Sequence, residues 1–212
     1  MTPRGRFITL EGGDGTGKST QAVLLKAALS RLGIEAVLTR EPGGSPGAEA
    51  IRTLLVSGAV DRWDGMTEAL LHSAARLDHF SKTIRPALDA GRWVISDRFA
   101  DSTLAYQGYG HGVPLERLNA LNTVVLQGFA PDLTLVFDLA PEQGLKRAAT
   151  RQGEGAEDRY ERMDPSFHAK LRQGFLEIAA LHPERCAVLA VEGDAEAMHA
   201  RVMALVRHRL LS

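Results

Sequence analysis

Short apolar runs alternate along the chain with longer segments in which apolar residues recur every three to four positions. The short runs are almost continuously apolar, which is typical of strands that helices cover on both faces. The longer segments have helical periodicity, so the alternation indicates βαβ units around a parallel sheet. The predicted strands are 7–10, 36–39, 93–97, 133–139 and 187–191. The predicted helices are 18–32, 48–55, 66–90, 115–126, 141–150, 166–181 and 195–211.

One polar segment departs from this alternation. Residues 151–164 read RQGEGAEDRYERMD, with charges and glycines but no apolar periodicity. Such a segment is either a solvated surface loop or a mobile flap that carries cations, and its composition alone leaves both possibilities open.

Length and charge narrow the class of protein. The 212 residues suit one large α/β domain over 1–212. Lys and Arg total 25 against 26 for Asp and Glu, so no basic field exists to attract nucleic acid. The single cysteine excludes a disulfide framework. No apolar run approaches the length of a membrane span, and we therefore expect a soluble, cytoplasmic protein with no membrane partner.

A phosphate-binding motif follows the first predicted strand. Residues 12–19 match G-x-x-x-x-G-K-[ST] at every fixed position, between a strand and a helix as the motif requires. The glycines let backbone N–H groups turn inward as an anion nest, beside the positive end of the helix. An exposed Lys18 would reach the β- and γ-phosphates, and the Ser19 hydroxyl would ligate Mg²⁺. The predicted nucleotide-binding residues are Gly12, Gly13, Asp14, Gly15, Thr16, Gly17, Lys18 and Ser19.

The motif predicts nucleotide binding but does not separate kinases from GTPases, motors or pumps. Two further groups follow strands, where ligands of parallel sheets bind. TREPGG ends the second strand and is either a binding loop or a turn. Asp97 and Arg98 end the third strand. The carboxylate can hold Mg²⁺ through water and the guanidinium can grip a phosphate, although a structural salt bridge is the alternative.

The motifs together resemble the thymidylate kinase family. EGGDGTGKST, TREPGG, SAARLDH, SDRFADSTLAYQG and PDLTLVFDLAPEQGLKR occur in the order and approximate spacing of that family, over nearly the whole chain. TREPGG together with DRFADSTLAYQG is specific to it. The resemblance implies a P-loop NTPase-type five-stranded parallel sheet with helices on both faces and a flexible lid at about 147–164. It also implies Mg-ATP as donor, dTMP as acceptor and a homodimer.

The resemblance implies roles for residues after the first three strands and on the helix 66–90. Asp14 would take the acceptor's 3′-hydroxyl, Arg76 the thymine edge and Arg98 the acceptor phosphate. Asp97 would organise metal and water. The other implied acceptor-site residues are Glu41 and Pro42, with a cis peptide bond between them, Ser102 and Thr103 beside the base, and Tyr106 against the 2′ position of the sugar.

Two positions depart from the pattern of the family. Position 15 is Gly, whereas one branch has Arg there, so the chain resembles the branch that supplies the catalytic Arg from the lid. Arg147, Arg151 and Arg159 are the candidates, with Arg151 the first choice. The family usually has a thymine-stacking Phe four residues before Arg76, and this chain has His72.

Two alternative functions are left open by the residues themselves. A kinase for another nucleoside monophosphate or for a deoxynucleoside would share the phosphate cradle, residues 12–19. It would differ only in the base pocket at His72, Arg76, Ser102 and Thr103. A GTPase-type switch or a non-catalytic nucleotide sensor belongs to another class. The chain has no Asn-Lys-x-Asp run to read guanine, and a sensor would not need lid arginines.

Overall fold

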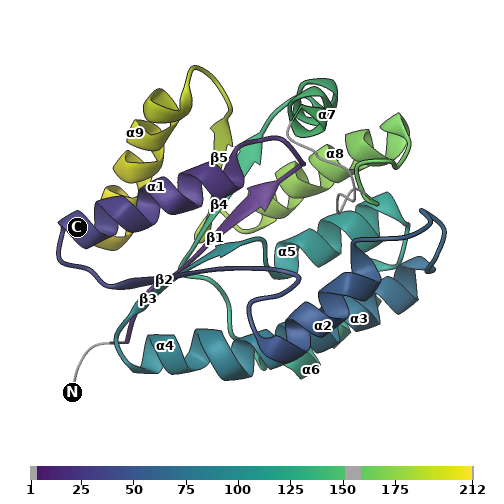
Figure 1. The fold of residues 1–212 in the computed structure, drawn as a ribbon, viewed down its shortest axis with the longest axis horizontal. Helices are drawn as coiled ribbons and strands as arrows, with labels where there is room; N and C mark the ends of the chain where they lie inside the picture. Colours follow the sequence, from purple (N-terminus) through teal and green to yellow (C-terminus); the bar gives the residue numbers. More distant parts are fainter. Residues whose placement is uncertain (1–3, 151–158, 212) are drawn as a thin grey trace.

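The computed structural model describes residues 4–150 and 159–211, and in this part of the chain it contains a five-stranded sheet ordered β2-β3-β1-β4-β5 (Figure 1). All four strand pairings are parallel. The predicted fold class is therefore confirmed. The strands are β1 (Phe7–Gly12), β2 (Ala36–Arg40), β3 (Trp93–Asp97), β4 (Leu133–Asp138) and β5 (Cys186–Ala190).

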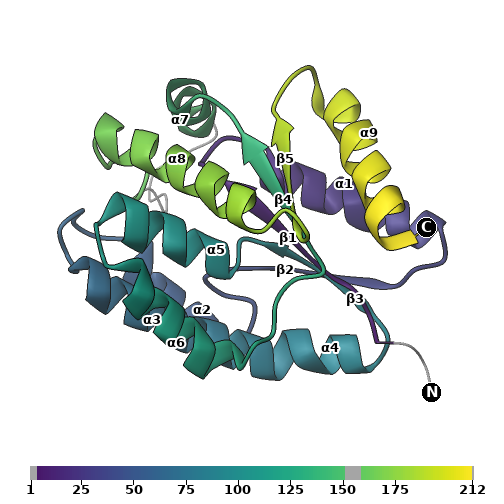
Figure 2. The ribbon, with the colours of Figure 1, turned by 180° about the vertical axis from the view of Figure 1, so that it is seen from behind.

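Strand β1 lies at the centre of the sheet, and every residue of it is buried. Ile8 pairs with Ile95 of β3 on one side and with Leu133 of β4 on the other. Its alternate side chains enter two different cores, as the period of two along a strand requires. Ile8 packs with the helices α1 and α9, and Phe7 packs with residues that precede and follow β3. Helices therefore cover both faces, as Figures 1 and 2 show.

The predicted helices are present, with ends that differ by a few residues. The helix predicted at 66–90 is continuous but passes through a π-helical turn, Phe80–Ile84, in which Arg85 donates its N–H to Phe80 O. Pro86 follows at once, and because it has no N–H, this is a place where the regular i→i−4 pattern is interrupted. The helices are α1 (Lys18–Arg31), α2 (Pro46–Leu55), α3 (Gly65–His79), α4 (Arg85–Asp89), α5 (Ala100–Thr103), α6 (Leu115–Leu126), α7 (Pro141–Ala149), α8 (Pro165–Leu181) and α9 (Ala195–Val206).

One helix was not predicted from the sequence. Helix α5 continues as a π-helical segment, Leu104–Gly110, through a glycine- and aromatic-rich stretch with no amphipathic period. Its residues 105–108 are buried, and Tyr106 packs against Phe175 of α8. Tertiary packing, rather than local propensity, therefore sets this helix. Within the described ranges, no helix is both long and apolar enough to cross a membrane.

Candidate active site

The phosphate cradle links β1 to α1, as the sequence predicts. Gly15 and Gly17 have φ values of 71° and 92°, in the left-handed region that favours glycine. A Cβ atom at Gly15 would also lie 1.9 Å from Gly144 O of α7. Position 15 therefore has no room for a side chain, and an arginine cannot be supplied from this position of the loop.

Lys18 is buried, and the expectation that it is exposed is wrong. Its Nζ donates to Gly12 O at 3.0 Å, to Gly13 O at 2.6 Å and to Thr16 Oγ1 at 3.3 Å. The ammonium thus closes the phosphate loop on itself and is held at the floor of the cradle. Burial, together with the nearby Arg98 cation, lowers the pKa of Lys18 to about 8. An anionic phosphate in the cradle would favour the charged form.

Ser19 and Asp97 meet at the carboxyl edge of the sheet. Ser19 Oγ donates to Asp97 Oδ2 at 2.5 Å, although the two residues are 78 positions apart. Hydroxyl and carboxylate oxygens are the donor set that Mg²⁺ prefers. In the described part of the chain, no group of three His, Cys, Asp or Glu side chains could hold a metal ion by itself. The two oxygens fit a magnesium ion that takes its other ligands from phosphates and water.

Arg98 occupies the space between the phosphate cradle and the neighbouring pocket. Its backbone has φ 72°, which is unusual for a residue with a side chain. Arg98 Nη2 donates to Asp14 Oδ1 at 2.6 Å, and Nη1 donates to Gly12 O at 2.9 Å. Tyr106 also donates to Asp14, at 3.1 Å. Burial raises the pKa of Asp14, but Arg98 and Lys18 outweigh it and hold that pKa below its usual value.

A buried carboxylate that the sequence analysis missed shapes the turn at Arg98. Glu11 Oε1 accepts from Phe99 N at 2.8 Å, and Oε2 accepts from Ser102 Oγ at 2.6 Å. Burial, with Asp101 adding to it, raises the pKa of Glu11 to about 7. Glu11 directly precedes the fixed glycine of the phosphate-binding motif, and its position at the end of a buried strand was the only signal in the sequence.

The predicted acceptor-site residues surround one cavity of about 230 Å³. This volume is below the range of drug-sized ligand pockets, which begins at about 300 Å³. A second cavity of about 250 Å³ lies over the phosphate cradle and shares five lining residues with the first: Asp14, Ser19, Asp97, Arg98 and Glu161. The predicted residues that line the first cavity are Asp14, Glu41, Pro42, His72, Arg76, Arg98, Ser102, Thr103 and Tyr106.

Arg76 forms the charged centre of this cavity. Its side chain is 1 % exposed, and Nε donates to Glu41 Oε2 at 2.8 Å. Nη2 donates to Thr103 Oγ1 at 3.0 Å and to Phe99 O at 3.1 Å. Nη1 is buried and has no hydrogen-bond partner among the described residues. Buried donors are rarely left unpaired, so the free N–H groups indicate a place for a ligand acceptor.

Glu41 and Pro42 reach the cavity through the loop after β2. The peptide bond between them is cis, as the resemblance implies. Glu41 Oε1 lies 3.0 Å from His79 Nδ1, while its other oxygen accepts from Arg76. Burial raises the pKa of Glu41, but Arg76 and His79 have the larger effect and hold that pKa below its usual value. The carboxylate therefore stays charged. The loop therefore fixes the guanidinium of Arg76 rather than pointing a free carboxylate into the cavity.

His72 lies one turn before Arg76 and faces the same cavity. Its Nε2 is 3.1 Å from the hydroxyl of Tyr160, and the two ring centroids are 6.2 Å apart. Burial, with Arg76 as the next cause, lowers the pKa of His72 to about 4, so the imidazole is neutral near pH 7. Tyr160 belongs to the polar segment after α7, and its place in the cavity wall was not predicted.

The candidate lid arginines have different surroundings. Arg147 is exposed in the last turn of α7, next to Ala148, which lines the cavity over the phosphate cradle. Arg151 lies outside the described residues. Arg159 is fully buried and paired with Glu68. This placement does not suit a cation that reaches the donor phosphates, so Arg147 and Arg151 are the better candidates.

Comparison with known proteins finds similarity along nearly the whole chain. A family model described as thymidylate kinase matches residues 10–202. The chain is 49% identical over 209 residues to a thymidylate kinase of Nitrobacter winogradskyi, covering 99% of this chain and 91% of that protein. It is 50% identical over 207 residues to one of Caulobacter vibrioides, covering 98% of each. A crystal structure of the Ehrlichia chaffeensis thymidylate kinase superposes with a TM-score of 0.77 at 36% identity, covering 96% of this chain and 99% of that one.

Proposed function

This chain belongs to the thymidylate kinase family and phosphorylates dTMP, and we propose that it does so with Mg-ATP as the phosphoryl donor. In this proposal residues 1–212 form a single nucleoside-monophosphate kinase domain, with a lid at about 147–164. A homodimeric assembly is part of the proposal. Leu70 and Leu77 of α3 lie seven residues apart, hence on one helix face, and are 50% and 47% exposed. Large exposed apolar side chains of this kind support a contact with a second copy of the chain.

The phosphate cradle holds the donor. Its backbone N–H groups and Lys18 bind the β- and γ-phosphates, and Lys18 needs to exchange carbonyl partners for phosphate oxygens to do so. Ser19 and Asp97 would hold the magnesium ion, directly or through water. The ion would neutralise negative charge that accumulates on the donor phosphates during transfer.

The cavity that Arg76 lines holds the acceptor, dTMP. Arg76 Nη1 donates to the thymine edge, and Ser102, Thr103 and His72 border the base. Asp14 accepts from the 3′-hydroxyl. Arg98, which contacts Asp14 in this structure, places its guanidinium where it can also bind the acceptor phosphate. Tyr106 stands beside Asp14 and crowds the 2′ position of the sugar.

Phosphoryl transfer takes place where the two cavities join. An oxygen of the acceptor phosphate attacks the γ-phosphorus, the bond from that phosphorus to the β,γ-bridging oxygen breaks, and ADP leaves. The acceptor oxygen is already anionic, so no protein nucleophile is required. The chain aligns two phosphates and supplies cations where charge accumulates, and an Arg of the lid, Arg151 or Arg147, is the last of these.

The single observation that carries the acceptor assignment is that Arg76, which lines this cavity with Asp14 and Arg98, has a buried Nη1 without a hydrogen-bond partner among the described residues. The test is dTDP formation, followed by chromatography, from dTMP and ATP with and without magnesium. Magnesium-dependent dTDP formation supports the proposal. Equal rates without any divalent cation would contradict the metal assignment, and absence of dTDP would contradict the function.

Replacing Lys18 by alanine is expected to lower kcat by at least about 10²–10³-fold, because the transition state loses a charge aimed at the donor phosphates. The structure adds a second expectation. Loss of the ammonium's hydrogen bonds to Gly12 and Gly13 should destabilise the fold by about 1–3 kcal/mol, since bonds to charged groups are the stronger ones. Circular dichroism and thermal unfolding separate the two effects, and near-normal turnover of folded enzyme would contradict the assignment of Lys18.

Replacing His72 by alanine is expected to weaken dTMP binding by about 1 kcal/mol or more, a typical magnitude for stacking. Neutral imidazole is flat and can stack on thymine, although it offers less apolar area than phenylalanine. His72→Phe is therefore the matched variant and should keep or improve affinity. Calorimetry of dTMP binding to the parent and both variants at one pH measures this. An unchanged dissociation constant for His72→Ala would show that another residue covers the base.

A further inference from the structure

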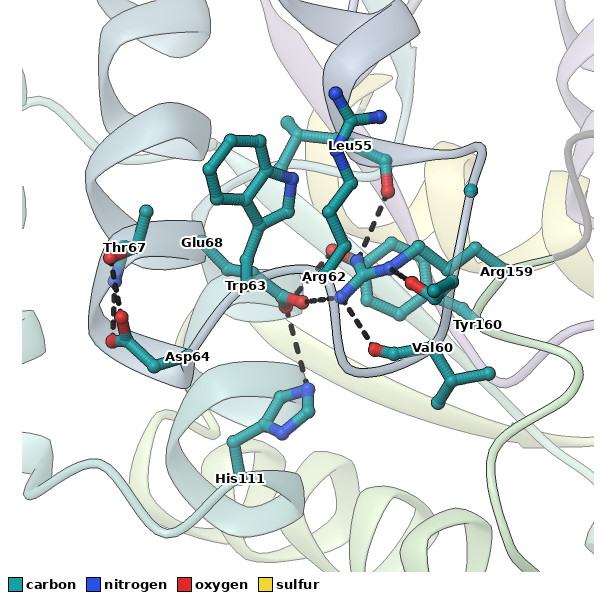
Figure 3. A network of polar contacts seen from close by, with 12 residues as sticks. Leu55, Val60, Arg62, Trp63, Asp64, Thr67, Glu68, His111, Arg159 and Tyr160 are labelled. Atoms are coloured by element: carbon teal, nitrogen blue, oxygen red, sulfur yellow. Dashed lines mark hydrogen bonds and ion pairs between the residues drawn. The ribbon is translucent and has the colours of Figure 1, made fainter.

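Arg159 is held by the loop between α2 and α3 and by one carboxylate (Figure 3). Its side chain is fully buried. Nε donates to Ala59 O at 2.9 Å, Nη1 to Leu55 O at 3.1 Å and Nη2 to Val60 O at 2.8 Å. Nη2 also forms an ion pair with Glu68. One planar guanidinium thus joins the segment that follows α7 to a loop about 100 residues earlier in the chain.

Glu68 collects several donors around the same point. Its Oε2 accepts from Gln107 Nε2 at 2.9 Å and from the Tyr160 hydroxyl at 3.1 Å, and His111 Nε2 lies 3.4 Å away. Burial raises the pKa of Glu68, but His111, Arg159 and Gln107 outweigh it and lower that pKa to about 2. The carboxylate is therefore a fixed negative charge that contacts two separate segments of the chain, residues 107–111 and residues 159–160.

The buried cluster of Glu68, Arg159 and Tyr160, called the anchor, adjoins the cavity that Arg76 lines, called the acceptor cavity. Glu68, His72 and Arg76 follow one another at intervals of four on α3, so they lie on one face of the helix. Tyr160 donates its hydroxyl proton to Glu68, which leaves the hydroxyl oxygen to accept from the neutral imidazole of His72. The ring of Tyr160 stands edge-on to Tyr106, with centroids 5.2 Å apart. His72, Tyr106 and Tyr160 all line the cavity, whereas Arg159 does not.

We propose that Arg159 is a positioning residue for the acceptor pocket: it clamps Glu68 to the α2–α3 loop and thereby sets Tyr160 against His72 at the base-facing wall. The inference rests on the proposed function, because it assigns the wall to dTMP. A role confined to stability would have a different signature. It would change the fraction of folded enzyme, and so the apparent kcat, but it would leave the KM of the folded enzyme for dTMP unchanged.

Arg159→Lys tests the proposal because lysine keeps the charge beside Glu68 but replaces a planar five-donor fork with a single point of donation. It cannot satisfy the three carbonyls and the carboxylate together. We expect the KM for dTMP to rise by about 10-fold, since misplacement of positioning groups by around 1 Å can cost up to about 10²-fold. The KM for ATP should stay within about twofold, because the anchor residues Glu68, Arg159 and Tyr160 do not line the cavity over the phosphate cradle. Calorimetry of dTMP binding without ATP gives the same comparison independently of turnover.

Tyr160→Phe supplies the partner variant, because it removes only the hydroxyl between Glu68 and His72. If Arg159 acts through Tyr160, the two changes are coupled, and the double variant should raise the dTMP KM no more than the larger single effect. If the two residues acted independently, the fold-increases in the dTMP KM of the two single variants would multiply in the double variant. Should Arg159→Lys fail to fold, Tyr160→Phe alone decides, with a rise of about threefold or more expected.

Arg172→Lys is the matched control. Arg172 of α8 makes a two-point ion pair with Asp138, the last residue of β4, at 2.6 and 3.0 Å, and it lines neither the acceptor cavity nor the cavity over the cradle. It should leave the dTMP KM unchanged. A dTMP KM within twofold of the parent for Arg159→Lys, or multiplicative effects in the double variant, would overturn the proposal. Turnover of dTMP by the parent enzyme tests the proposed function separately, so failure of one is distinguishable from failure of the other.

Discussion

The enzyme is expected to phosphorylate dCMP about 10⁴-fold less efficiently than dTMP, measured as kcat/KM. Arg76 is the physical reason. Its guanidinium has only donors and is fixed by Glu41, Thr103 and Phe99 O, with Nη1 left for the ligand. Thymine presents the O4 acceptor at the edge where cytosine presents an amino donor. A site built to pair a substrate group rejects an analogue that leaves its polar groups unpaired by about 10⁴–10⁵-fold.

The matched comparison is dUMP, which differs from dTMP only by the thymine methyl group. One methyl or methylene group in a pocket separates substrates by about 10–200-fold, so dUMP should be a poor but measurable substrate. Initial rates of ADP release for the three nucleotides, at saturating ATP, give the two ratios. Equal use of dTMP and dCMP would contradict both the role of Arg76 and the thymidylate specificity.

Replacing Arg151 by alanine is expected to lower kcat by about 10³-fold or more, the range in which an arginine delivered to the transferring phosphoryl group contributes. The cradle cannot supply that cation itself, because Gly15 has a positive φ and no room for a side chain beside Gly144. The KM for dTMP should change far less, since the interaction is made mainly in the transition state. Steady-state kinetics with both substrates varied measure the separation.

Arg147→Ala is the second test of the same idea, because Arg147 directly precedes Ala148, which lines the cavity over the cradle. Arg162→Ala serves as a control for loss of an arginine from the same region. Arg162 donates to Gly58 O on the exposed surface, and its loss should leave kcat within about threefold of the parent. Normal turnover in both Arg147→Ala and Arg151→Ala would mean that the lid does not supply the charge.

Local rules were enough to predict the phosphate cradle and most of the sheet. The spacing of glycines in residues 12–19 encodes the turn, and apolar runs encode buried strands, whatever the rest of the chain does. Strand β3 therefore ends at Asp97 as predicted, and Asp97 meets Ser19 because the carboxyl ends of parallel strands share one edge. The resemblance to a family predicted a set of acceptor-site residues, and the structure places them around one cavity.

What the sequence could not decide is which charged groups are buried and with what. Lys18 has carbonyl partners in the cradle, and Arg159, in a segment that reads as a polar loop, is fully buried against Glu68, 91 positions earlier. Helix α5 and its continuation exist because α8 packs on them, not because their residues favour a helix. The physical reason is common to all three cases. A charged side chain is buried, or a segment of low helix propensity becomes helical, only when distant segments supply the contacts. The fold, rather than the neighbouring residues in the sequence, defines those contacts. The sequence by itself thus determined the sheet, the phosphate cradle and the family, whereas only the tertiary structure decided how Arg76, Glu68 and Arg159 are paired around the acceptor pocket.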